Sequence, residues 1–70
     1  MRYLILIEPT ETGFSAYSPD LPGCVSTGRT AADVQTNTRE AIEGHLEELR
    51  LAGLPIPQPT TAAGYVEVAA

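Results

Sequence analysis

Residues 17–30 read YSPDLPGCVSTGRT, and this stretch decides how the chain turns from a strand into a helix. Its conformation is restricted by two prolines and two glycines, which are Pro19, Pro22, Gly23 and Gly28. Proline locks φ and glycine alone reaches positive φ freely, so the segment is typical of a rigid connector. We expect two turns around a short strand at residues 24–27, with a helix directly after them. Such rigidity serves either topology or recognition.

Two strand patterns precede the connector. Residues 3–7 are continuously apolar, too short for a helix and followed by Pro9, so they predict a central strand buried on both faces. Residues 14–17 alternate between apolar and polar side chains after a turn signal at 10–13, which predicts an antiparallel partner. Together with residues 24–27, these segments are expected to form a three-stranded meander.

A long helical pattern follows the connector. Thr30 offers its hydroxyl to the free amides of a helix start, and Asp33 lies near the positive end of the helix dipole. Apolar or small side chains then recur every three or four residues and form one stripe, which comprises Val34, Thr38, Ala41, Ile42, Leu46 and Leu49. We expect the helix to begin at Ala31 and to end near Ala52, because Gly53 and three prolines follow.

One more strand pattern follows the prolines. Residues 65–68 read Tyr-Val-Glu-Val and predict a short strand. A right-handed crossover after the helix places this strand parallel to the first strand, on its free edge. The predicted fold is therefore α+β with two layers and the order βββαβ: a four-stranded mixed sheet of order 3-2-1-4 with one helix on one face. A single domain is expected to span residues 1–70.

The second face of the predicted sheet has no cover within the chain. Leu4 and Leu6 point opposite to Ile5 and Ile7, so both faces of the first strand are apolar. A chain of 70 residues buries only roughly 60% of its unfolded surface, and a single cysteine, Cys24, excludes an internal disulfide. We expect a second copy to cover this face in a homodimer or higher homo-oligomer; a different protein is the alternative.

The charge balance excludes some partners. The formal net charge is −5, and the only basic residues are four scattered arginines, Arg2, Arg29, Arg39 and Arg50. Nucleic-acid binding needs a basic face, so we expect no direct binding to DNA. An acidic chain favours a basic partner, although many proteins are simply acidic. No leader pattern and no membrane-spanning stretch of ~20 apolar residues is present, so we expect a cytoplasmic chain without membrane contact.

The residues with reactive side chains do not form a recognisable site. Glu43 and Glu47 are one helical turn apart, but their neighbours indicate a solvated face. His45 lies beside the apolar stripe and is interpreted as structural, and Cys24 as a small buried hydrophobic residue. One cysteine and one histidine cannot make a zinc site alone, and the glycines do not match a phosphate-binding loop. We therefore predict no enzyme, no catalytic residue, no metal and no cofactor.

The connector and its surroundings carry a family resemblance. The residues concerned are Gly13–Tyr17, Ser18–Cys24, Ser26–Thr30, Asn37, Glu40–Ile42, Leu46–Leu49 and Gly53–Pro57. Over roughly residues 1–60 the chain resembles the HicB-like antitoxin family. The resemblance implies a partial RNase H-like fold without catalytic carboxylates, and a protein that binds and shields a small basic HicA-like toxin that cleaves mRNA. Many family members carry a DNA-binding segment after the last strand, so the chain resembles a short form without one.

Two alternative functions stay open. An oligomeric scaffold or small-ligand-binding module would have kept the fold and lost the toxin partner. A metal-dependent nuclease would need several converging carboxylates, and only Glu8 lies near a plausible place. Within the connector, Tyr17, Asp20 and Leu21 are the candidates for partner contact; for Tyr17 and Leu21, packing against the core is the alternative.

Overall fold

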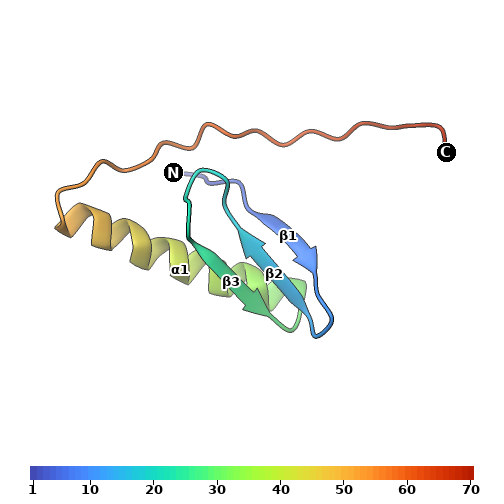
Figure 1. The fold of residues 1–70 in the computed structure, drawn as a ribbon, viewed down its shortest axis with the longest axis horizontal. Coiled ribbons are helices and arrows are strands. Elements are labelled where there is room, and N and C mark those ends of the chain that lie inside the picture. The colour runs from blue at the N-terminus through green and yellow to red at the C-terminus, as the bar shows by residue number, and fades with distance from the viewer.

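The chain forms a three-stranded antiparallel sheet with one helix packed on one face (Figure 1). The structure is a computed structural model that describes residues 1–70. The strands are β1 (Leu6–Pro9), β2 (Phe14–Tyr17) and β3 (Val25–Gly28), arranged in the order β1-β2-β3, and the helix α1 (Ala31–Leu51) follows them. After the helix, residues 54–70 run back past the N-terminal segment without forming a helix or strand, and we call them the tail.

The helix begins and ends where its capping residues predict. Thr30 has extended backbone angles, and its Oγ1 accepts a hydrogen bond from the Asp33 amide at 3.0 Å. At the other end, the amides of Gly53 and Leu54 donate to carbonyls of the last turn at 3.1 and 2.9 Å. This pair of bonds is the Schellman arrangement, which satisfies carbonyls that the helix leaves free. The predicted helix is confirmed to within one residue at each end.

The predicted stripe of the helix packs against the sheet. Val34, Thr38 and Ile42 are its buried residues, and the helix packs more closely on β3 and β2 than on β1. Gly28 permits this close approach, because a Cβ at that position would lie 2.5 Å from the Val34 amide nitrogen. The buried Thr38 hydroxyl is satisfied, since it donates to the Val34 carbonyl at 2.6 Å.

The connector supplies the centre of the hydrophobic core. Leu21 is fully buried and forms a cluster with Cys24 and Ile42. Partly buried side chains pack around this cluster, namely Tyr3, Ile5, Ala41 and Leu46. Two successive turns hold Leu21 in place: its amide donates to the Ser18 carbonyl at 3.1 Å, and the Cys24 amide donates to the Leu21 carbonyl at 3.2 Å. The rigidity of the connector therefore serves the core directly.

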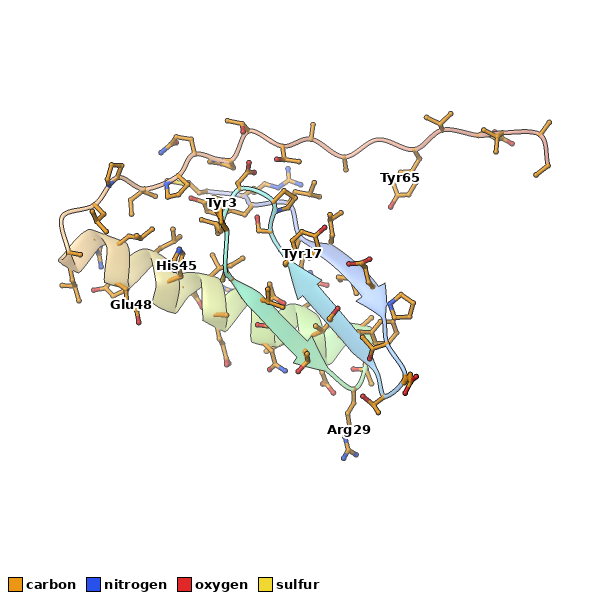
Figure 2. All side chains as sticks on the ribbon, in the orientation of Figure 1. Tyr3, Tyr17, Arg29, His45, Glu48 and Tyr65 are labelled. Carbon is orange, nitrogen blue, oxygen red and sulfur yellow. The ribbon has the colours of Figure 1, made fainter.

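The predicted fourth strand is wrong. The sheet has three strands and is wholly antiparallel, so the four-stranded mixed sheet of order 3-2-1-4 is not formed. Residues 61–65 of the tail are separated from residues 4–7 by a hollow of about 570 Å³. The tail passes this edge with Ala62, Ala63 and Gly64, which are poor strand formers, and Tyr65 follows them, fully exposed on the tail (Figure 2). The strand pattern at 65–68 therefore comes after the edge that it was expected to join.

The first strand is an edge strand, whereas the sequence predicted a central one. β1 spans Leu6–Pro9 instead of residues 3–7 and pairs only with β2. Leu6 and Ile7 keep 39% and 38% of their surface exposed, so the strand is not buried on both faces. The prediction of a central first strand was wrong for the same reason as the prediction of a fourth strand, because no further strand pairs with the outer edge of β1. The predicted β2 at 14–17 is confirmed, and β3 lies one residue later than predicted.

Candidate partner-binding surface

The open face of the sheet exposes a row of three apolar side chains. The strand register pairs Leu6 with Tyr17, and Tyr17 with Val25, so these residues share one face. Ala16, the neighbour of Tyr17, is fully buried. By contrast, Tyr17 is 38% exposed, Leu6 is 39% exposed and Val25 is 63% exposed. Because side chains alternate along a strand, the three point away from α1. We call Leu6, Tyr17 and Val25 the apolar row.

A polar row lies next to the apolar row on the same face. The register pairs Glu8 with Ser15, and Ser15 with Thr27. Each of these residues is two positions from a member of the apolar row, so both rows point in the same direction. The open face is therefore divided into an apolar strip and a polar strip that contains one carboxylate. An apolar centre beside a polar rim is the usual composition of a protein interface.

The three connector residues predicted for partner contact occupy different environments. Tyr17 is the middle member of the apolar row and is exposed on the open face (Figure 2). Leu21 has no exposed surface and lies in the core, which is the alternative that the sequence left open for it. Asp20 lies at the surface of the connector, where its carboxylate contacts the tail. Of the three, Tyr17 presents its side chain on the sheet face.

Asp20 holds the tail through three hydrogen bonds. Its Oδ1 accepts from the Thr61 hydroxyl at 2.8 Å and from the Thr60 hydroxyl at 3.2 Å, and its Oδ2 accepts from the Thr61 amide at 3.2 Å. The bond from the Thr61 hydroxyl contributes most to lowering the pKa of Asp20 below its ordinary value of 3.8, because it favours the charged carboxylate. A second anchor is the Tyr3 hydroxyl, which donates to the Pro57 carbonyl at 2.6 Å. Residues 57–61 are thus fixed to the N-terminal segment through Pro57 and to the connector through Thr60 and Thr61.

The residues weighed for chemistry lie apart from one another. Cys24 is 6% exposed, and burial raises the pKa of its thiol. His45 is half-buried on α1 (Figure 2), and Glu8 belongs to the polar row. No three histidine, cysteine, aspartate or glutamate side chains are grouped as metal ligands would be. No helix combines the length and the apolarity that a membrane span requires.

Two members of the apolar row were not among the predicted contact residues. The sequence placed Leu6 on one of the two apolar faces of the first strand without a role in binding, and Val25 was interpreted only as part of a short strand. Their alignment with Tyr17 depends on the pairing register, which joins residues that are distant in sequence. The available signal is the alternation Val25-Ser26-Thr27, which marks Val25 and Thr27 as sharing a face.

This fold defines a class of small α+β domain in which one helix covers one face of an antiparallel sheet and the other face is open. The profile described as "HicB_like antitoxin of bacterial toxin-antitoxin system" matches residues 3–69. The chain therefore belongs to the HicB-like antitoxin family, as the connector motif indicated.

Relatives occur in a phage and in an archaeon. A protein of Haemophilus phage HP1, named as an uncharacterized 14.9 kDa protein in the rep-hol intergenic region, is 33% identical over 66 residues, which are 94% of this chain and 50% of the phage protein. A UPF0150 protein of Thermoplasma acidophilum is 34% identical over 59 residues, covering 83% of this chain and 86% of the relative. The chain thus spans half the length of the phage relative and most of the archaeal one.

Two solved structures share the fold at 42% sequence identity. The HicA3 and HicB3 toxin-antitoxin complex matches with a TM-score of 0.74, covering 86% of this chain and 70% of the matched chain. The crystal structure of the antitoxin HicB3 matches with a TM-score of 0.72, covering 86% of this chain and 44% of the other. The chain thus spans 70% and 44% of the two chains that it matches.

Proposed function

We propose that this chain is a non-enzymatic antitoxin-type protein that binds and shields a small basic HicA-like toxin. The toxin implied by the family resemblance cleaves mRNA, so the pair is expected to act in the cytoplasm. Residues 1–70 act as one HicB-like domain. The similarity to HicB3 supports a toxin partner, since one of the matched structures is a complex of HicA3 with HicB3.

The apolar row is the observation that supports binding most directly. Leu6, Tyr17 and Val25 lie side by side across the three strands and remain exposed. Adjoining exposed apolar side chains on a sheet face are typical of protein interaction sites. Tyrosine is enriched among the residues that dominate binding energy, because it combines a large apolar ring with a polar hydroxyl. We therefore assign Tyr17 as the central contact, flanked by Leu6 and Val25.

The charge distribution favours a basic partner. The formal net charge is −5, and the chain has no lysine. On the exposed surface of α1, Arg39 pairs with Glu43 at 4.0 Å and Arg50 pairs with Glu47. Two of the four arginines are thus next to carboxylates, which leaves the surplus negative charge to steer a basic protein toward the chain. This steering weakens as the salt concentration rises.

The other two connector candidates act differently from Tyr17. Asp20 is proposed to contribute at the surface, where it fixes the tail next to the connector. Leu21 is proposed to contribute from the core, where it sets the position of the connector that follows Tyr17.

A matched pair of substitutions on β3 tests the apolar row. Val25→Asp and Thr27→Asp add the same charge on the same face, two residues apart, but only the first removes a member of the row. Calorimetric titration with a HicA-like protein that binds the parent chain is expected to show binding at least about tenfold weaker for Val25→Asp, which corresponds to ~1.4 kcal/mol. Thr27→Asp is expected to stay within about twofold of the parent.

Two results would count against the assignment in different ways. Equal weakening by both substitutions would show that added charge, rather than the apolar row, controls the affinity. Absence of binding between the parent chain and any HicA-like protein, with the chain folded by circular dichroism, would contradict the antitoxin function itself.

A further inference from the structure

The outer edge of β1 has no partner within the chain. The order β1-β2-β3 leaves β1 bonded on one side only, so half of its backbone amides and carbonyls point away from the sheet. A hollow of about 570 Å³ lies beside this edge, between residues 4–7 and residues 61–65. Exposed strand edges are templates for pairing with another strand, and native proteins usually cover or blunt them. The tail passes beside this edge without a backbone hydrogen bond to it.

The end of the tail offers an unpaired strand pattern. Tyr65, Val66 and Val68 are 100%, 85% and 73% exposed, and no backbone–backbone hydrogen bond involves residues 62–70. The run Tyr-Val-Glu-Val alternates between the two sides of an extended chain, and tyrosine and valine favour strands. Three large apolar side chains in water are costly, so this segment gains from a partner.

The tail is anchored so that this pattern misses its own sheet. Asp20 fixes Thr60 and Thr61, and the next three residues, Ala62 to Gly64, pass beside β1. Tyr65 comes next and is fully exposed, and the chain continues from there away from the domain (Figures 1 and 2). One chain therefore carries both a vacant strand edge and a strand-forming segment that extends past it.

We propose that two copies of this chain exchange their tails, so that residues 65–68 of each copy pair with β1 of the other. The exchange is reciprocal, so a twofold axis satisfies both edges and both segments at once. Ala62, Ala63 and Gly64 form the hinge, because they lie between the Asp20 anchor and the strand pattern and carry little side-chain bulk. For a domain of 70 residues, this association also supplies apolar burial that a single copy lacks.

Both sides of the exchanged segment would meet a surface of the other copy that suits their side chains. Val66 and Val68 share one face of an extended strand, and Tyr65 and Glu67 share the other. On the helix side of β1, an open groove of about 800 Å³ is lined by apolar side chains that include Tyr3, Ile5 and Leu46. A strand next to β1 places two side chains over this groove, where valines are readily accommodated. Tyr65 and Glu67, on the other side of the strand, then extend the open face of the sheet beside Leu6.

Sedimentation of the chain alone, without a toxin, tests the exchange. The parent is expected to form a dimer at about 100 µM and to dissociate on dilution. Val66→Asp is expected to weaken dimerisation at least about tenfold, whereas Ala69→Asp, which adds the same charge to the tail outside the strand pattern, is expected to change it less than about twofold. Val66 is 85% exposed in a single copy, so both variants should keep the helical content of the parent.

Hydrogen exchange separates tail exchange from other modes of association. Amides of residues 65–68 and of β1 are expected to be protected only at concentrations where the dimer forms. A chain that stays monomeric, or a dimer insensitive to Val66→Asp, would overturn the proposal. Protection of residues 65–68 in the monomer would also overturn it, because the tail would then pair within its own chain. None of these outcomes depends on toxin binding, so they leave the proposed function to its own test.

Discussion

Replacing Gly28 with alanine probes how closely β3 approaches the helix. The added Cβ would lie 2.5 Å from the amide nitrogen and 2.8 Å from the Cα of Val34. Both atoms belong to the helix backbone, so neither can move aside as the end of a flexible side chain could. Overpacking of this kind costs about 1–3 kcal/mol, and a contact with backbone belongs in the upper part of that range. We expect Gly28→Ala to lose about 2–3 kcal/mol of unfolding free energy.

The expected loss is large relative to the stability of a small domain. At about 0.05–0.15 kcal/mol per residue, a chain of this size has roughly 3.5–10 kcal/mol in total. A loss of about 2–3 kcal/mol lowers the Tm of such a domain by roughly 8–24 °C. Urea unfolding followed by circular dichroism, together with a thermal melt, measures both quantities.

Gly44→Ala provides the matched control for the same substitution. Gly44 lies within α1, and apart from the surrounding turns of its own helix a Cβ there would meet no atom within 4 Å. Alanine is favoured over glycine inside a helix by about 0.5–1 kcal/mol, so this variant is expected to be more stable than the parent. A Gly28→Ala variant as stable as the parent would refute the close approach of β3 to Val34, whatever the result for Gly44.

Three further measurements test individual groups. The buried Ser18 hydroxyl has no hydrogen-bond partner, so Ser18→Ala is expected to leave stability within about 0.5 kcal/mol or to raise it; a loss above about 1 kcal/mol would reveal a bond to this hydroxyl. The thiol of Cys24 is buried and its pKa is raised, so it should react with a disulfide reagent roughly 100-fold or more slowly in the folded than in the unfolded chain; equal rates would show that the site opens readily. NMR titration of Asp20 should give a pKa below 3.8, so the anchor stabilises the fold above that pH and is lost as the pH falls through the lowered value. In Thr61→Val the titration midpoint should rise toward 3.8, and an unchanged midpoint would show that the Thr61 hydroxyl does not set it.

The helix and its connection to the sheet could be predicted because their signals are local. The cap at Thr30 and the stop at Gly53 act on amides and carbonyls within a few residues of themselves, so the sequence alone locates both ends. The apolar stripe predicted the buried face of the helix for the same reason, since its period is a property of the helix itself.

The edge position of β1 and the path of the tail could not be predicted in this way. Both depend on where residues 57–61 are held, and that is decided by bonds to Tyr3 and Asp20 from residues about 40 or more positions away. The right-handed crossover rule says how a fourth strand would connect, but not whether the connection is the right length to reach the edge. The residues that lie beside β1 are Ala62, Ala63 and Gly64, whereas the strand pattern at 65–68 lies further along the tail. The predicted sheet order was wrong for that reason.

Only part of the candidate surface could be predicted from the sequence. The continuous apolar run of the first strand predicted a second apolar face without a cover, and Tyr17 was named as a contact candidate. The alignment of Leu6, Tyr17 and Val25 into one row requires the register of two strand pairs, which no local pattern specifies. For Leu21 the sequence left partner contact and core packing both open, and the structure places this side chain in the core.

The most direct test of the proposed function is to measure whether this chain inhibits the cleavage of mRNA by a HicA-like toxin. With the toxin held constant and the chain titrated, we expect cleavage to stop near equal concentrations of the two proteins. Val25→Asp should require at least about tenfold more protein for the same inhibition, and Thr27→Asp should match the parent within about twofold. Undiminished cleavage in the presence of excess folded parent chain would contradict the claim that this protein shields a toxin.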